Sequence, residues 1–391
     1  MMLALLNRRT VLAGSLALGA STLALPRIAL AQGSSTRNLL FVLLRGAADG
    51  MAMLAPLGDP ALEALRGATL ADYESAPRID SFFALHPALI EVGKAAQAGE
   101  ALFVHAAATT YRERSHFDGQ NLLETGGTAP YATKDGWLNR LVGLLAESHG
   151  GEAPRALAVA PTVPLALRGK APVSSYAPST LPDASADYMA RVTALYDGDA
   201  ELAGLWSRAL ETRAMAGDDG LRSLRDGSAN GTLIASLMKG PQGARIAMIE
   251  VDGWDTHANQ RGAFTRSARG LDAMLAAYKA GMGEKWANTM VLVATEFGRT
   301  AKLNGTNGTD HGTAGAALVM GGGVGGGRVL ADWPGLGESQ LYEGRDLAPT
   351  IALESVLAGA VAEHFAIDPA LAMARLFPGR SAKPLSGVVR A

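Results

Sequence analysis

Residues 290–322 of this 391-residue chain read MVLVATEFGRTAKLNGTNGTDHGTAGAALVMGG. The stretch starts with the apolar, β-branched run 290–295, which has the length and composition of a strand buried on both faces of a sheet. A segment rich in Gly, Asn and Thr then predicts a loop, and a second apolar run follows at 316–320. Open α/β sheets place their sites just beyond the carboxyl ends of buried strands. The loop after residue 295 is therefore expected to form the floor of an active or metal-binding site.

This loop carries the polar residues Glu296, Arg299, Asp310 and His311. A carboxylate directly after so apolar a strand is costly to bury without a partner. Glu296 is therefore interpreted either as a metal ligand or as the partner of Arg299 in a structural ion pair. Asp310 and His311 are interpreted as ligands, and a capped loop is the alternative for this pair.

Acidic and histidine residues follow other expected strands in the same way. Apolar runs of strand length occur at 39–44, 101–105, 156–160 and 245–251. The polar clusters beyond them are Asp49; His116 with Asp118; and Asp252 with Asp255 and His257. Because parallel strands end at the same edge of a sheet, these clusters are expected to converge with the loop after residue 295. Asp49 and Asp252 each precede a glycine, so a turn is the alternative reading for both.

The donor types restrict which metals the chain can hold. The sequence contains no cysteine, so a metal must be held by oxygen and nitrogen ligands, and no disulfide framework exists. Carboxylates with imidazoles suit Zn²⁺, Mn²⁺ or Ca²⁺. The site could hold one ion or two. Two ions about 3.5–4 Å apart would clamp the attacking and leaving oxygens of a displacement.

A nucleophile is less clearly marked in the sequence. Ser115 and Thr110 both lie near the start of an expected helix, where free N–H groups and the helix dipole stabilise an anion. A serine that only caps the helix is the alternative for Ser115. No Gly-x-Ser-x-Gly elbow is present, and the glycine run 321–327 is not followed by the Gly-Lys-Ser/Thr of a phosphate loop.

The whole chain has the composition of a globular protein, with 48% hydrophobic and 18% charged residues. Strands alternate with helices, which predicts an α/β domain over 32–391, with a mainly parallel sheet covered by helices on both faces. A Pro/Ser-rich stretch at 171–186 precedes polar helical patterns. Residues 161–240 are therefore predicted to be a helical insertion or cap over the sheet.

Residues 1–31 have the pattern of a twin-arginine signal peptide. Arg8 and Arg9 precede the apolar run 11–25, and Ala29 and Ala31 offer the small residues of a cleavage site. This predicts export by the twin-arginine translocase to a periplasmic or secreted location. An uncleaved membrane anchor is the alternative, but the run is short for a span of about 20 residues. The formal net charge of −2 disfavours a nucleic-acid partner.

Together with the leader, five motifs carry a family resemblance. They are LLRGAADG at 43–50, SHFDGQ at 115–120, GWDTH at 253–257, TEFGRT at 295–300 and GTDHG at 308–312. They resemble a family of exported bacterial proteins catalogued as a domain of unknown function. That family is similar to a branch of the alkaline phosphatase and sulfatase superfamily.

The resemblance implies an alkaline-phosphatase-like fold, a divalent-metal centre and hydrolysis of phosphate or sulfate esters. Carried over by position, it implies the metal ligands Asp49, Asp252, His257, Glu296, Asp310 and His311. Ser115 falls where the superfamily keeps its nucleophile. The sulfatase maturation pattern, Cys or Ser followed by x-Pro-x-Arg, is absent, which disfavours a formylglycine sulfatase.

The sequence therefore predicts an exported, metal-dependent hydrolase of phosphate-type or sulfate esters. Its expected substrate is a small anionic ester, and no stable membrane span is expected after processing. The alternative from another class is a non-catalytic periplasmic protein that binds metal or assists assembly and retains the same fold.

Overall fold

The structure, a computed structural model, describes residues 36–148, 150–178, 185–216 and 224–390. The expected signal peptide lies outside this part of the chain. Within the described residues, no helix is both long and apolar enough to cross a membrane.

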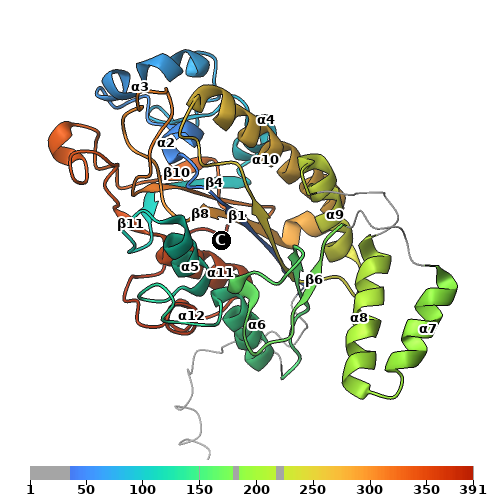
Figure 1. Cartoon of the computed structure of the whole chain (residues 1–391). Coiled ribbons are helices and arrows are strands. Elements are labelled where there is room, and N and C mark those ends of the chain that lie inside the picture. Colours follow the sequence, from blue (N-terminus) through green and yellow to red (C-terminus); the bar gives the residue numbers. More distant parts are fainter. Residues whose placement is uncertain (1–35, 149, 179–184, 217–223, 391) are drawn as a thin grey trace, which may run out of the picture. The chain divides into compact units, whose positions relative to one another are not determined.

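A nine-stranded sheet forms the centre of the domain (Figure 1). Its strands run in the order β10-β4-β9-β8-β1-β7-β5-β6, and β11 also pairs with β4. The bounds are β1 Asn38–Leu44, β4 Ala101–Ala108, β5 Ala156–Val159, β6 Ser174–Tyr176, β7 Ile246–Val251, β8 Thr289–Thr295, β9 Gly315–Gly321, β10 Arg328–Leu330 and β11 Ile351–Ala352. Only β9 pairs antiparallel, with β4 and β8, among these strands. The predicted mainly parallel sheet is confirmed.

Helices cover both faces of this sheet. Their bounds are α2 Gly50–Met53, α3 Leu62–Leu70, α4 Ile90–Gln97, α5 His116–Thr125, α6 Trp137–Ser148, α7 Ala186–Tyr196, α8 Ala200–Ala216, α9 Gly227–Lys239, α10 Gln260–Met282, α11 Leu353–Phe365 and α12 Pro369–Leu376. A separate two-stranded sheet joins β2 (Leu54–Ala55) to β3 (Ala84–Leu85).

Strand β1 shows why the central strands are apolar without interruption. Successive side chains of a strand point to opposite faces, and all seven residues of β1 are buried. Leu40 and Val42 pack in one core cluster with residues of α4, α9 and α10. Leu39 and Phe41 pack in another with residues of α6, α11 and α12. Both faces of the sheet are therefore covered, as the sequence predicted.

The stretch 161–240 contributes two different parts. Strand β6 extends the sheet beside β5, and α9 buries Ile234, Leu237 and Met238 in the same cluster as β1. Helices α7 and α8, in contrast, leave Leu195 78% and Leu205 51% exposed. Helices α7 and α8 are thus much less buried than α9.

Candidate metal centre

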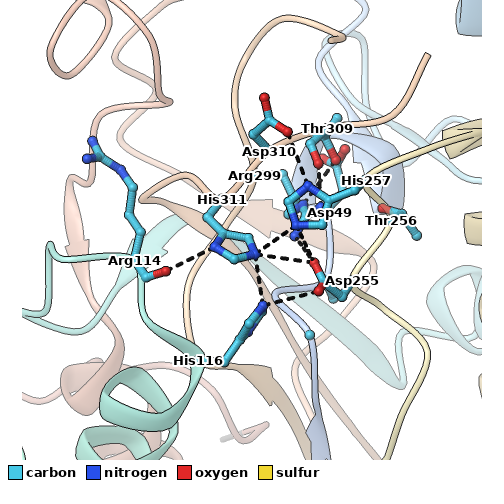
Figure 2. A network of polar contacts seen from close by, with 12 residues as sticks. Asp49, Arg114, His116, Asp255, Thr256, His257, Arg299, Thr309, Asp310 and His311 are labelled. Carbon is cyan, nitrogen blue, oxygen red and sulfur yellow. Dashed lines mark hydrogen bonds and ion pairs between the residues drawn. The ribbon is translucent and has the colours of Figure 1, made fainter. Parts of the chain in front are cut away.

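The site lies at the carboxyl edge of the parallel strands. Leu44, the last residue of β1, is in register with Val251 of β7 and with Thr295 of β8. The loops after β7 and β8 therefore begin at the same edge of the sheet, on either side of β1. Figure 2 shows side chains from these two loops and from the start of α5 pointing toward one another.

Three imidazoles and one carboxylate meet at this point. Nε2 of His311 lies 2.9 Å from Nε2 of His116 and 3.0 Å from Nε2 of His257. Asp255 Oδ1 lies 3.0 Å from Nε2 of His257 and 3.3 Å from Nε2 of His311. One ligand atom each from His116, Asp255 and His311 all lie within 4.8 Å of one another. The four side chains are 23–46% exposed, so the cluster can be reached from solvent.

The other ring nitrogen of each histidine already has an acceptor. The pairs are His116 Nδ1 with Glu296 Oε1 at 2.8 Å, His257 Nδ1 with Asp310 Oδ1 at 3.1 Å, and His311 Nδ1 with the Arg114 carbonyl at 3.0 Å. A carbonyl or an ionised carboxylate can only accept a hydrogen bond. Each Nδ1 therefore carries a proton, and a ring without a second proton presents a lone pair at Nε2.

The protonation of the three imidazoles determines whether His116, Asp255, His257 and His311 fit a metal ion. With a single proton on each ring, three Nε2 lone pairs and the Asp255 carboxylate face one another at hydrogen-bond distance with no donor among them. Such an arrangement is unfavourable unless a cation, or additional protons, lies between the acceptors. Imidazole nitrogens with a carboxylate are ordinary ligands of divalent transition metals, and Nδ1–H bonded to a carboxylate or carbonyl is the usual support of a ligating histidine. The residues therefore fit a divalent metal ion.

Glu296 supports this site from behind as an ionised group. It is fully buried, and its oxygens accept from the Gly46 N–H, Gln120 Nε2 and the Thr295 hydroxyl as well as from His116. Burial by itself raises the pKa of Glu296, but the hydrogen bonds from His116, Gly46 and Gln120 outweigh it and hold the pKa below its ordinary value. Glu296 thus orients His116, and its oxygens are already occupied.

Burial and neighbouring charges shift the pKa values of His116, His311 and Asp255. The hydrogen bond to Glu296 raises the pKa of His116. Burial, with the charges of His116 and Arg299, lowers the pKa of His311 and favours its neutral form. Burial raises the pKa of Asp255, but the guanidinium of Arg299, at 2.7 Å, outweighs it and keeps the pKa low. Arg299 is therefore the partner of Asp255, whereas the sequence offered Glu296 as its partner.

His311 is held at both its ring and its backbone. Arg114 has a left-handed backbone, with φ of 58°, and presents its carbonyl to Nδ1 of the ring. Arg345 donates to the carbonyl of His311. The buried carboxylate of Asp346 accepts from Nε of Arg114 and Nε of Arg345, each at 2.9 Å, and from the Thr313 hydroxyl. Asp346 therefore fixes both arginines that hold His311.

Asp49 was predicted as a ligand, but the structure does not bring it into the cluster. Its Oδ2 accepts from Nη1 of Arg66 and Nε2 of Gln260, both at 2.7 Å. Its Oδ1 accepts from the N–H groups of Met51 and Ala52 and so caps α2. The carboxylate of Asp49 is therefore fully occupied by protein donors.

The other sequence-predicted ligands divide into three groups. His257 and His311 lie in the group formed by His116, Asp255, His257 and His311, which we call the donor cluster. Glu296 and Asp310 lie one hydrogen bond behind it, as acceptors of Nδ1–H groups. Asp252 is exposed just beyond the end of β7.

The sequence places His116 and Asp255 in the polar clusters beyond the strands, but it does not predict them as metal ligands. The Asp-x-His spacing of Asp255 and His257 after a strand was a usable signal, because both residues leave the same sheet edge. His116 occupies the first turn of α5, and Ser115 is the N-cap residue. The side chain of Ser115 makes no capping hydrogen bond, so its hydroxyl is not used in the way that the structural alternative assumes.

Residues 36–372 match the model of a protein family described as "Protein of unknown function (DUF1501)". No curated protein matches the chain.

Solved structures resemble the chain at low sequence identity. The PH0037 protein from Pyrococcus horikoshii has 13% identity and a TM-score of 0.35, over 73% of this chain and 85% of that chain. The C-terminal periplasmic domain of EcEptC from Escherichia coli, in complex with Zn, has 9% identity and a TM-score of 0.36, over 74% of each chain. A protein in the alkaline phosphatase superfamily from Vibrio parahaemolyticus has 13% identity and a TM-score of 0.30, over 78% of this chain and 64% of that chain. The similarity to this superfamily is distant and assigns no activity, metal or substrate to this chain.

Proposed function

The chain belongs to the DUF1501 family of proteins of unknown function, and we propose that it is a metal-dependent hydrolase of phosphate-type esters. One observation carries this proposal: the Nε2 atoms of three histidines meet the Asp255 carboxylate, while every Nδ1 already has an acceptor. A divalent ion bound there would polarise an ester oxygen and stabilise negative charge developing on it. The ligands that we assign are His116, Asp255, His257 and His311.

The contacts support a single ion. A second ion would need further carboxylates from the same sheet edge, where the sequence offers Asp49, Asp252, Glu296 and Asp310. Asp252 is exposed beyond β7, and Asp310 Oδ1 accepts from Asn304 and pairs with His257 Nδ1. The carboxylate of Asp49 is occupied by Arg66 and Gln260, and that of Glu296 by His116 and other donors. The buried guanidinium of Arg66 thus supplies the positive charge beside Asp49.

The donor set also narrows the choice of metal. Ca²⁺ prefers six to eight oxygen ligands, whereas three imidazole nitrogens and one carboxylate suit Zn²⁺ or Mn²⁺. Of the three ions considered from the sequence, Zn²⁺ and Mn²⁺ therefore fit this cluster, and Ca²⁺ does not.

Ser115 is the nucleophile that we assign. It directly precedes the ligand His116, and its hydroxyl does not cap α5. The first N–H groups of a helix and its dipole favour negative charge, so the start of α5 would stabilise both an alkoxide and the anionic ester. The backbone N–H of Ser115 donates to the Tyr111 hydroxyl at 3.2 Å, which fixes the position of the segment.

Hydrolysis of 4-nitrophenyl phosphate, bis(4-nitrophenyl) phosphate and 4-nitrophenyl sulfate by metal-loaded protein tests this function. We expect turnover of at least one phosphate-type ester, loss of turnover after chelation, and a decrease of roughly a hundredfold or more in Ser115→Ala. If His311→Ala loses its metal but wild-type protein hydrolyses none of the three, the non-catalytic metal-binding alternative is correct.

We also propose that the protein acts outside the cytoplasm. Arg8 and Arg9, followed by a short apolar run, support this location. In cells, Arg8→Lys with Arg9→Lys should leave the full-length precursor in the cytoplasm. Normal export of this variant, or of wild type in a strain without the twin-arginine translocase, would contradict the proposal.

A further inference from the structure

Helix α10 carries a basic groove a short distance along the chain from the metal centre. A hollow of about 550 Å³ is lined by Asn259, Arg261, Gly262, Thr265, Arg266 and Arg269. We call this hollow the α10 groove. It begins two residues after His257, which lies in the donor cluster. All three arginines are exposed.

Within residues 36–148, 150–178, 185–216 and 224–390, two of these arginines have no carboxylate partner. Arg261 forms an ion pair with Asp72. Among the described residues, no acidic group lies within ion-pair distance of Arg266 or Arg269. Like charges three residues apart on a helix repel each other, and Arg266 and Arg269 have this spacing.

The acidic residue nearest to Arg269 along α10 is Asp272, and its carboxylate accepts hydrogen bonds from α4. Asp272 lies three residues further along α10, but it is only 7% exposed. Its carboxylate accepts from the N–H groups of Glu91 at 3.1 Å and Val92 at 2.9 Å, at the start of α4. The groove therefore keeps an uncompensated positive charge on a chain whose formal net charge is −2.

The size of the groove indicates what it can hold. An α-helix rises 1.5 Å per residue, so Arg261 and Arg269 are separated by about 12 Å along the axis. This distance exceeds the size of one phosphate or sulfate group and suits a molecule with several anionic groups. Guanidinium groups bind phosphate and sulfate oxygens through paired N–H donors.

We propose that the α10 groove binds further anionic groups of the substrate, which is then an ester with several phosphate or sulfate groups. The part of this inference that concerns the substrate rests on the proposed hydrolase function. Anion binding in the groove does not depend on it, because none of the lining residues belongs to the donor cluster.

Binding of sucrose octasulfate, a small polyanion that chelates metals poorly, tests the proposal by isothermal titration calorimetry at low ionic strength. The groove variant is Arg266→Gln with Arg269→Gln. The control variant is Lys134→Gln with Lys170→Gln, which removes the same charge from exposed positions outside α10. We expect the groove variant to bind at least about tenfold more weakly than wild type and the control to bind within about twofold. His311→Ala should bind as wild type does, so the result does not depend on metal or turnover.

Three outcomes would overturn the proposal: no binding by wild-type protein, unchanged affinity in the groove variant, or an equal loss in the control variant. The last would mean that the polyanion responds only to net charge. If wild-type protein binds the polyanion but hydrolyses none of the three esters, the proposed hydrolase function fails and anion binding in the groove stands.

Discussion

Glu296 Oε1 lies 2.8 Å from Nδ1 of His116, so a fully buried carboxylate stands directly behind a partly exposed imidazole. The carboxylate fixes the tautomer of His116 and directs its Nε2 lone pair toward the cluster. In the proposed metal centre, the residue after β8 is therefore a support, and the proposed ligand His116 comes from α5.

Glu296→Gln should weaken metal binding without abolishing it. Supporting partners of metal-ligating histidines typically contribute about 10–100-fold in affinity. His116→Ala removes the ligand itself and should lose the metal entirely. Competition with a chromogenic chelator measures both affinities. Equal and complete loss in the two variants would show that Glu296 ligates the metal directly.

Asp346→Asn should loosen His311 and destabilise the fold. The buried carboxylate of Asp346 accepts from two partly exposed arginines, and a hydrogen bond to a charged group typically contributes about 1.5–3 kcal/mol. Here the variant also releases Arg114 and Arg345. We expect a lower denaturation midpoint in urea together with weaker metal binding.

The matched control for that variant is Glu343→Gln. Glu343 also pairs with Arg114, but its side chain is 56% exposed. Exposed ion pairs contribute little to stability. Similar losses of stability and of metal affinity in the two variants would show that Asp346 has no special role.

Acid should destabilise the protein through its buried histidines. Burial lowers the pKa of His86, His105 and His364 to about 4 in each case. Between the unfolded value of 6.5 and about 4, the unfolded chain binds protons that the native state does not, so stability falls as pH falls. Each histidine contributes a loss of up to about 1.4 kcal/mol per pH unit in this window.

His364→Gln isolates one of these contributions. A glutamine amide can donate to the Asn38 carbonyl, as Nε2 of His364 does at 3.0 Å, but it does not titrate. Urea unfolding at pH 7, 6 and 5 should therefore show a smaller loss of stability in the variant than in wild type. An identical pH dependence in the two proteins would contradict the assignment of a neutral, buried His364.

Limited proteolysis should cut α7 and α8 first. These helices expose Leu195, Leu202 and Leu205 and have few buried residues, so they should open at low free energy. Trypsin should cleave earliest at Arg191 or Arg208. First cleavage at Lys239, the last residue of α9, would place the weak point in a helix that is part of the core.

The sequence predicted the sheet well because its central strands are continuous apolar runs that can be recognised without knowledge of tertiary contacts. Strands β1 and β8 are uninterrupted apolar runs, and burial on both faces is the only way to remove such runs from water. The strand-end rule then placed His257 and His311 at one edge, and the structure brings these two residues together.

The roles of individual carboxylates could not be predicted in the same way. Asp49 and Glu296 both follow apolar strands, but their partners come from elsewhere in the chain. Arg66 lies on α3 and Gln120 on α5, and sequence periodicity does not show that these side chains reach the strand ends. Our assignment of His116, and not Glu296, as a proposed ligand depends on the same tertiary contacts.

Elemental analysis of protein purified without added metal or chelator tests the central claim most directly. We expect about one equivalent of Zn or Mn per chain in wild type and in the control His364→Gln, and almost none in His116→Ala and His311→Ala. Two equivalents per chain in wild type, or wild-type metal content in His311→Ala, would contradict a single ion bound by His116, Asp255, His257 and His311.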